Sequence, residues 1–182
     1  MTAGAGAVPG LRLRPATEAD VAAMLAIYRP HVAQGVVSFE TELPTPEAFA
    51  ARVRRALEGW AWLVAELDGV VLGYAYGSAH RERAAYRWSV ETTVYVAPAL
   101  QRRGVGLALV RALLDALAQR GYCNAYAGVT VPNPASVALH RAAGFVPIGC
   151  FPRVGHKFGR WHDVAWFHRV LREDPPEAVA AP

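Results

Sequence analysis

The chain has 182 residues, 53% of them hydrophobic, which suffices for one good core and leaves no room for a second large domain. It holds no apolar run near the ~20 residues of a membrane-spanning helix, and its first residues lack the charged-then-apolar layout of a signal peptide. Nineteen Lys and Arg against fifteen Asp and Glu give a net charge of +4 without a long basic run, which argues against nucleic-acid binding and for a small anionic ligand.

The first half of the chain predicts strands and helices in alternation. Apolar side chains at every second position indicate a strand, whereas a capping residue before an apolar repeat of three to four indicates a helix. Asp68-Gly69 is the clearest turn, because this pair adopts the positive φ angles of a two-residue hairpin loop. These rules predict strands at residues 11–14, 61–67 and 70–79, and helices from Thr17 to residue 28 and from Thr45-Pro46 to about residue 57.

The second half continues this alternation and sets the fold class. Asn133 suits the N-cap of a helix, and Gly144 suits the residue that ends it. The patterns predict strands at residues 88–96, 124–129, 146–151 and 163–171, and helices at residues 104–119 and 133–143. This order implies an α/β (α+β) fold with a mixed, mostly antiparallel twisted sheet of about six to seven strands and helices on both faces.

We expect one soluble, cytoplasmic domain over residues 11–171. Its ends, residues 1–10 and 172–182, are rich in Ala, Pro and Gly, and we expect them to be flexible. Cys123 and Cys150 lie in apolar, strand-like surroundings, which predicts buried thiols without a disulfide. His156, His162, Asp163 and His168 match no usual metal-ligand spacing, so no metal site is expected.

A loop of basic and glycine residues opens the helix at residues 104–119, and it reads Gln101-Arg102-Arg103-Gly104-Val105-Gly106. Free backbone N–H groups, the positive end of the helix dipole and two guanidinium groups converge there, which favours a pyrophosphate. Leu109 stands where a dinucleotide-binding motif needs glycine, and the Gly-Lys-Ser/Thr of a P-loop is absent. The loop therefore predicts another phosphorylated cofactor, unless it is only a basic turn that caps a surface helix.

The loop resembles the Gln/Arg-x-x-Gly-x-Gly pyrophosphate loop of the GNAT superfamily of N-acetyltransferases. Residues 133–145 resemble the second signature of this superfamily, Asn-x-x-Ala/Ser-x-x-x-aromatic-x-x-x-Gly-Phe. The two motifs stand in the expected order along the chain. The resemblance implies the GNAT fold and an enzyme that uses acetyl-CoA as its acetyl donor.

Three further segments resemble the phosphinothricin and methionine sulfoximine acetyltransferases within GNAT, over nearly all of residues 11–171. These are Thr93-Val94-Tyr95-Val96, Leu139-His140-x-x-x-Gly144-Phe145 and residues 155–163. The resemblance implies direct acetyl transfer, in a ternary complex, to the α-amine of a small glutamate- or methionine-like compound. It also implies a homodimer, with residues 155–163 in a turn that closes over the substrate or joins the dimer contact.

Acetyl transfer from a thioester needs a base that keeps the attacking amine neutral and an acid for the departing thiolate. Glu91 places a carboxylate in an otherwise apolar strand, on the face that alternation assigns to Thr93 and Tyr95. The resemblance implies Glu91 and His140 as the catalytic pair, with His140 where most GNAT proteins have Tyr. A structural ion pair of Glu91 and a core-packing role of His140 are the alternatives.

The resemblance also implies the ligand contacts. Those for acetyl-CoA are Val94, Tyr95, Val96, Arg102, Arg103, Gly104, Val105, Gly106, Leu107 and Asn133. Those for the amino-acid substrate are Phe39, Arg81, Glu82, Arg83, Arg87, Glu91, Thr92 and Thr93. Arginine suits a carboxylate or phosphinate because its donors form a bidentate fork, although Arg81 and Arg83 also fit a solvated loop.

Two other functions stay open on the sequence. One is N-acetylation of another amine, such as a polyamine or a protein N-terminus. The other is a non-catalytic module that binds acyl-CoA, against which the presence of both Glu91 and His140 argues.

Overall fold

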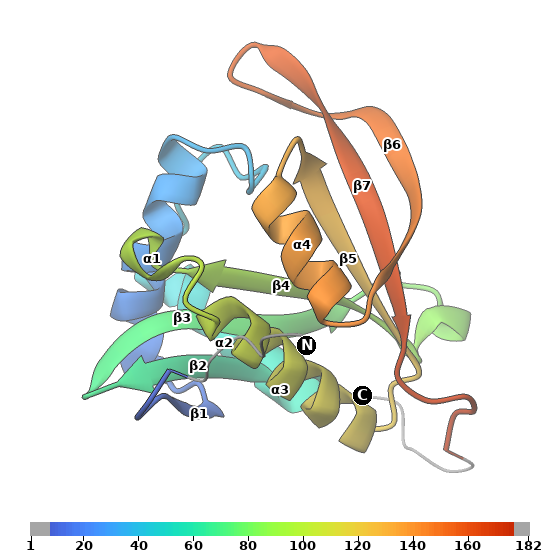
Figure 1. Cartoon of the computed structure of the whole chain (residues 1–182), viewed down its shortest axis with the longest axis horizontal. Helices are drawn as coiled ribbons and strands as arrows, with labels where there is room; N and C mark the ends of the chain where they lie inside the picture. The colour runs from blue at the N-terminus through green and yellow to red at the C-terminus, as the bar shows by residue number, and fades with distance from the viewer. Residues whose placement is uncertain (1–7, 177–182) are drawn as a thin grey trace, which may run out of the picture.

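A twisted sheet of seven strands runs through the computed structural model, which describes residues 8–176 (Figure 1). The strands are β1 (Arg12–Pro15), β2 (Trp62–Leu67), β3 (Val70–Ala79), β4 (Ser89–Val96), β5 (Asn124–Val131), β6 (Val146–Lys157) and β7 (Arg160–Val170). Their order across the sheet is β1-β2-β3-β4-β5-β7-β6, and each neighbouring pair is antiparallel except β4 and β5. The predicted mixed, mostly antiparallel sheet is confirmed. Of the predicted flexible ends, residues 1–7 and 177–182 lie outside the described residues.

Four α-helices cover the two faces of the sheet in this part of the chain. They are α1 (Val21–Ala33), α2 (Pro46–Gly59), α3 (Val105–Gln119) and α4 (Pro134–Ala142). One face packs against α3 and α4 through a core that includes Ala75, Val90, Leu109, Leu113 and Leu117. The other packs against α1 and α2 through Met24, Phe49, Val53, Trp62 and Tyr74. Helices on both faces agree with the prediction, and none of these four is long and apolar enough to span a membrane.

The parallel pair β4 and β5 leaves an opening in the sheet. Its ladder joins Ser89, Val90 and Glu91 to residues 124–126 and goes no further, so the rest of β4 has no partner on that side. Strand β4 then leads through a short loop into α3, and β5 leads into α4. The amino ends of both helices therefore meet beside the unpaired part of β4, where their exposed N–H groups favour an anion.

The hairpin of β6 and β7 is longer than the sequence predicts. Its turn is Phe158-Gly159, with φ angles of 52° and 74°, rather than a broad turn over residues 155–163. The tip projects beyond the rest of the sheet (Figure 1) and reaches the loop that follows α1. Lys157 Nζ donates hydrogen bonds of 2.8 Å to the carbonyl oxygens of Val32 and Ser38, and Gly155 leaves no room for a Cβ because the Phe39 ring lies against it.

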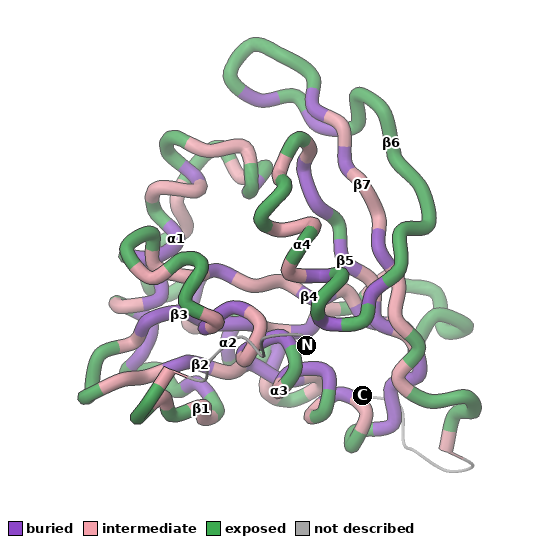
Figure 2. The backbone as a smooth tube through the Cα atoms, viewed as in Figure 1, coloured by how far each residue is buried: buried purple, intermediate pink, exposed green. Residues whose placement is uncertain are grey.

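Strand β6 forms an exposed edge of the sheet, and residues 146–154 are all exposed (Figure 2). The expectation of two buried thiols is correct for Cys123 and wrong for Cys150. The apolar residues around Cys150 indicated a buried strand, but β6 pairs only with β7. Apolar pattern alone does not distinguish a central strand from an apolar edge strand.

Candidate active site

A cavity of about 540 Å³ lies where the amino ends of α3 and α4 face the unpaired part of β4. Strand β4 contributes Val94, Tyr95 and Val96 to its wall. The remaining lining residues come from the loop and start of α3, from the start of α4, and from the end of α1 with its following loop: Leu100, Gln101, Arg102, Gly104, Gly106, Leu107, Asn133, Pro134, Ala135, Ser136, Ala138, Leu139, His31 and Val37.

The loop before α3 turns its backbone toward this cavity. Arg102 and Gly104 adopt left-handed conformations, with φ angles of 64° and 83°, and Gly104 is the N-cap of α3. No side chain caps this helix end, so the first N–H groups of α3 stay available to a ligand. Gly106 lets α3 and α4 approach closely, because a Cβ there would lie 2.8 Å from Leu139 Cδ1. These donors and the helix dipole fit a pyrophosphate.

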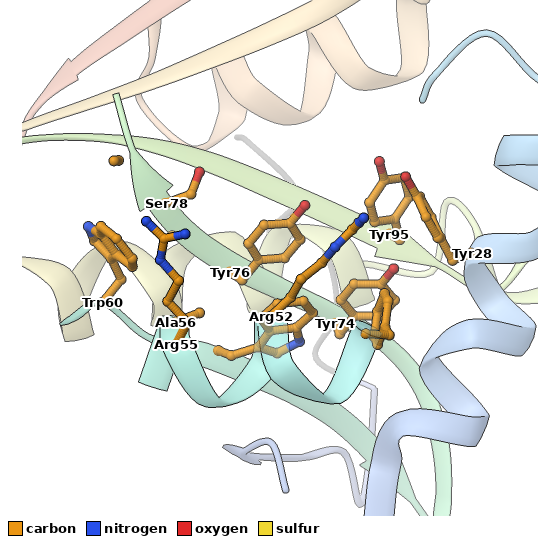
Figure 3. A pocket seen from close by; sticks show the side chains of 13 residues that line it. Tyr28, Arg52, Arg55, Ala56, Trp60, Tyr74, Tyr76, Ser78 and Tyr95 are labelled. Atoms are coloured by element: carbon orange, nitrogen blue, oxygen red, sulfur yellow. The ribbon is translucent and has the colours of Figure 1, made fainter. Parts of the chain in front are cut away.

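A second cavity, of about 340 Å³, lies on the opposite face of the sheet between α2 and β3 (Figure 3). Most of its wall is aromatic, and Arg52 and Arg55 of α2 reach over it. The other lining residues are Tyr28, Phe49, Ala56, Trp60, Trp62, Tyr74, Tyr76, Gly77, Ser78, Ala79 and Tyr95. Tyr95 lines both cavities, so the two meet at this residue of β4.

The polar groups of the second cavity are only partly paired. Arg52 donates to Glu40 Oε1 at 2.5 Å, and the hydroxyls of Tyr28 and Ser38 lie 2.6 Å apart. The hydroxyl of Tyr74 is buried without a hydrogen-bond partner. Burial raises the pKa of Tyr28 to about 12 and raises the pKa values of Tyr74 and Tyr95 further, so these phenols are neutral at physiological pH.

Glu91 of β4 lies on the sheet face that carries the second cavity. It is opposite Ser78 of β3, a lining residue of that cavity, and beside Tyr126 of β5. Its Oε1 accepts a 3.4 Å hydrogen bond from Arg81 and lies 3.1 Å from Nδ1 of His80. The His80 ring stacks on Tyr126 at 4.4 Å. The carboxylate keeps 30% of its side-chain exposure and is therefore reachable from the open part of this face.

Comparison with known families assigns this arrangement. The model of the acetyltransferase (GNAT) family matches residues 26–145 of the chain, a range that runs from α1 to the end of the α4 segment. The chain belongs to the GNAT family. It is an N-acetyltransferase with acetyl-CoA as its acetyl donor, and the fold, family and cofactor implied by the sequence resemblance are confirmed.

Relatives of this GNAT enzyme span nearly its whole length. Phosphinothricin N-acetyltransferase of Streptomyces viridochromogenes is 38% identical over 172 residues, which are 94% of each chain. L-methionine sulfoximine/L-methionine sulfone acetyltransferase of Salmonella typhimurium is 36% identical over 164 residues, 90% of this chain and 96% of the relative. A crystal structure of a GNAT superfamily phosphinothricin acetyltransferase from Sinorhizobium meliloti, in complex with acetyl-CoA, has a TM-score of 0.89 at 37% identity and covers 93% of this chain and 95% of that chain.

Most residues nominated for acetyl-CoA line the cavity at the helix ends. They are Val94, Tyr95, Val96, Arg102, Gly104, Gly106, Leu107 and Asn133. Arg103 and Val105 do not line it: Arg103 is exposed, and the Val105 side chain is 1% exposed within the core. Val105 faces the core because it is the first residue of α3, on the side that packs against the sheet. Its side chain therefore has no place in the cofactor site.

The residues nominated for the substrate are more dispersed. Arg81, Glu91 and Thr93 share one face, whereas Thr92 lies on the opposite one, where it is 7% exposed and its hydroxyl donates to the Tyr126 carbonyl. Alternation along β4 turns the Thr92 side chain away from the second cavity, and its nominated role in the substrate site stays a prediction.

The four other nominated substrate residues lie outside the wall of the second cavity. The Phe39 ring is 6.2 Å from His162 at the hairpin tip. Glu82 and Arg83 are exposed in the β3–β4 connection. Arg87 is exposed too, with its guanidinium 5.1 Å from the Trp88 ring centre. None of these four lines either of the two large cavities.

His140 is a buried residue of α4, with 5% exposure. Its ring lies between Phe145 and Phe167, at centroid distances of 5.3 and 5.9 Å, and Nδ1 lies 2.8 Å from the Ser136 carbonyl oxygen. It lines neither of the two large cavities. Burial lowers its pKa, so the imidazole is neutral at physiological pH. Its catalytic role stays a prediction.

Sequence reasoning missed the aromatic cavity and the two arginines of α2. Arg52 and Arg55 are three residues apart and so share one face of their helix, which was a readable signal for a paired guanidinium site. Nothing local in the sequence indicated that this face of α2 would lie over β3. Among residues 8–176, no group of three or more His, Cys, Asp and Glu side chains is arranged to hold a metal ion.

Proposed function

We propose that this enzyme acetylates the α-amine of a small glutamate- or methionine-like amino acid or analogue, such as phosphinothricin, methionine sulfoximine or methionine sulfone. The activities of the two relatives named above support this substrate class. One structural observation carries the proposal: the cofactor cavity and the aromatic cavity meet at Tyr95, with Glu91 on the face of the second. An amine held in the aromatic cavity and an acetyl group held in the cofactor cavity would meet at Tyr95.

Each charged group of the site has a task in this proposal. Arg81 is exposed beside Glu91, and Arg52 and Arg55 line the aromatic cavity, so a substrate carboxylate or phosphinate finds guanidinium donors on either side. Glu91 accepts a proton from the substrate ammonium, directly or through water, and leaves the amine neutral for attack. The helix ends hold the pyrophosphate of acetyl-CoA and thereby fix the acetyl group along β4.

Transfer is direct, within a ternary complex. Neither Cys123 nor Cys150 lines one of the two large cavities, so no thiol is placed to take the acetyl group first. Initial rates with both substrates varied test this order. Double-reciprocal plots whose lines intersect support a ternary complex. Parallel lines would indicate a covalent acetyl-enzyme and would overturn direct transfer.

A panel of amines in a thiol-release assay tests the substrate class. We expect turnover with amino acids that carry a free α-carboxylate, and at least a tenfold lower kcat/KM with the matching amides and decarboxylated amines. Polyamines or peptides as the best substrates would replace the proposed class. Tight acetyl-CoA binding without turnover over the whole panel would instead favour a binding module.

Glu91→Gln tests the base, with Glu18→Gln, at an exposed carboxylate outside both large cavities, as its matched control. We expect kcat to fall by at least ~10²-fold in Glu91→Gln, while acetyl-CoA affinity changes less than about threefold, because general-base catalysis typically contributes 10²–10⁴-fold. Glu18→Gln should keep both parameters. Wild-type kcat in Glu91→Gln would remove Glu91 from this role.

We also propose a cytoplasmic homodimer. Exposed apolar residues of the β6–β7 hairpin support it, since Val146, Ile148, Phe151, Val154 and Phe158 would gain cover from a second copy. Light scattering coupled to size exclusion tests this at micromolar concentration. A mass of about 20 kDa throughout would show a monomer, since one chain has a mass of 19.6 kDa.

A further inference from the structure

His31 is the one histidine in the wall of the cofactor cavity. It lies in the last turn of α1, and its ring centre is 5.1 Å from that of Tyr95. Because Tyr95 also lines the aromatic cavity, His31 stands close to the junction of the two cavities. This is where the proposed function brings the amine and the thioester together.

The imidazole of His31 has a buried nitrogen atom that makes no hydrogen bond to a described residue. This atom is Nε2, which is buried and has no hydrogen-bond partner among residues 8–176. A buried polar atom left unpaired costs roughly 1–3 kcal/mol, and such atoms are few in folded proteins. The same side chain lines the cofactor cavity, so a turn of the ring toward a bound ligand would give Nε2 a partner.

His31 is neutral at physiological pH, because burial lowers its pKa. Few titratable groups face it. Tyr95 of β4 is a neutral phenol, Tyr28 lies one turn earlier on α1, and Lys157 from the hairpin is bound to the carbonyls of Val32 and Ser38. Arg102 is the arginine of the same cavity wall. A neutral imidazole can accept one proton and return it.

We propose that His31 is a catalytic residue that carries the proton from the amine to the thiolate. As the neutral amine nitrogen bonds to the acetyl carbon, the carbon–sulfur bond breaks and its electron pair goes to sulfur. The imidazole accepts the proton that the nitrogen loses and gives it to that sulfur, so the products are the amide and the free thiol of CoA. His31 ends in its starting state.

This inference rests on the proposed function and gives His31 the task that the family resemblance assigns to His140. The two histidines differ in access: His31 lines the cofactor cavity, whereas His140 lies between two phenylalanine rings. Glu91 keeps the separate task of removing the first proton from the ammonium. Glu91 on β4 and His31 on α1 therefore each carry out one of the two proton transfers.

The test compares His31→Gln with His140→Gln, a substitution at a histidine that lines neither of the two large cavities. We expect His31→Gln to lower kcat by at least ~10²-fold, with the dissociation constant of acetyl-CoA within threefold of wild type. It should also abolish the fall in kcat that protonation of this imidazole causes on the acid side, at a pH below its ordinary pKa of 6.5. Added imidazole should restore part of the rate of His31→Ala. His140→Gln should keep the acid limb of the pH profile.

A nuclear magnetic resonance titration gives a readout without turnover. We expect the His31 ring signal and its pKa to move when CoA binds, while those of His140 move less. An unmoved His31 signal, or kcat in His31→Gln within threefold of wild type with the acid limb intact, would overturn the proposal. The assays use the best amine of the panel, so an error in the proposed substrate class would appear in the panel and leave the His31 comparison intact.

Discussion

Gly104 occupies a backbone conformation that other residues rarely adopt. Its φ angle of 83° makes it the left-handed N-cap from which α3 starts, and this geometry turns the first N–H groups of the helix toward the cofactor cavity. The sequence motif predicted the glycine, and the structure supplies the conformational reason. Arg102, two residues earlier, is also left-handed, with φ of 64°, so the loop concentrates strain at the cofactor site.

Gly104→Val is expected to weaken acetyl-CoA binding by at least tenfold. A β-branched residue with positive φ costs roughly 1–2 kcal/mol or more, and the loop relieves this strain by moving its N–H donors. Calorimetric titration with acetyl-CoA measures the effect. Gly69→Val in the exposed β2–β3 turn, where φ is 79° and no atom lies near the missing Cβ, is the control that carries similar strain away from the site. Unchanged affinity in Gly104→Val would show that the loop does not bind the cofactor.

At the scale of elements, α4 beside the cofactor cavity and α2 beside the aromatic cavity begin with capping residues that the sequence identified. Asn133 Oδ1 accepts a 3.1 Å hydrogen bond from the Ser136 amide at the start of α4, and Thr45 Oγ1 accepts a 3.2 Å bond from Ala48 at the start of α2. Asn133 lines the cofactor cavity, whereas Thr45 lines neither of the two large cavities. A comparison of the two caps therefore distinguishes an effect on folding stability alone from an effect on both stability and cofactor binding.

Asn133→Ala and Thr45→Ala should each lower the free energy of unfolding by about 1 kcal/mol, the usual cost of a lost N-cap. Only Asn133→Ala should also raise the dissociation constant of acetyl-CoA, by severalfold, because its cap orders the cavity wall. Urea denaturation and calorimetric titration of both variants measure the two quantities. Equal acetyl-CoA affinity in the two variants would mean that the start of α4 does not contribute to cofactor binding.

At the scale of the whole molecule, segments distant in the chain hold the site together. Lys157 at the end of β6 binds carbonyls that lie 125 and 119 residues earlier. The lysine is 4% exposed, and burial lowers its pKa. These contacts dock the hairpin tip on the loop after α1, next to His31 and Phe39. The predicted role of this tip as a cover over the substrate stays a prediction.

Lys157→Met should release the hairpin tip. The substitution leaves two buried carbonyls without their donor, at a cost of roughly 1–3 kcal/mol. We expect faster amide hydrogen exchange at residues 155–162 and 34–40, with no change in α3. Phe158→Ala at the exposed turn is the control and should leave the exchange of residues 34–40 as in wild type. Unchanged exchange in Lys157→Met would show that other contacts dock the tip.

The first strand is joined to the start of α1 and to β2 by a partly buried charge cluster. Arg14 donates to both oxygens of Asp20, at 2.8 and 2.7 Å, and to Glu66 at 2.8 and 2.6 Å. The Arg14 guanidinium lowers the pKa of Asp20 to about 2. Because the folded-state pKa lies below the ordinary value of 3.8, this pair stabilises the fold above about pH 4, and the contribution disappears as the pH falls toward 2.

Wild-type protein should therefore lose on the order of 2 kcal/mol of unfolding free energy through Asp20 between pH 4 and pH 2. Asp20→Asn should lack this part of the acid dependence and be less stable at neutral pH. Glu18→Gln, which removes an exposed carboxylate paired with Arg54, should behave as wild type. Chemical denaturation between pH 2 and pH 4 measures the unfolding free energy of each variant. If this free energy fell with pH as steeply in Asp20→Asn as in wild type, the assignment to Asp20 would be contradicted.

The sequence by itself determined the elements and the cofactor loop. Strand alternation, the caps at Thr45 and Asn133, the Asp68-Gly69 turn and the Gly104 loop each depend on residues close together in the chain, so local physics fixes them. The ends of elements were less certain: α1 continues through Pro30 to Ala33, and β6 continues to Lys157. In both cases tertiary contacts at Val32 and Lys157 extend the element past its local signal.

Only the tertiary structure decided which side chains share a cavity. His31, Arg52 and Tyr76 come from three elements and gave no joint pattern, yet they line the two cavities that meet at Tyr95. Thr92, Val105 and His140 stood in the right motifs, but their side chains are buried away from those cavities. The physical reason is that a motif fixes the path of the backbone, while the direction and access of each side chain depend on which helix packs over which face of the sheet.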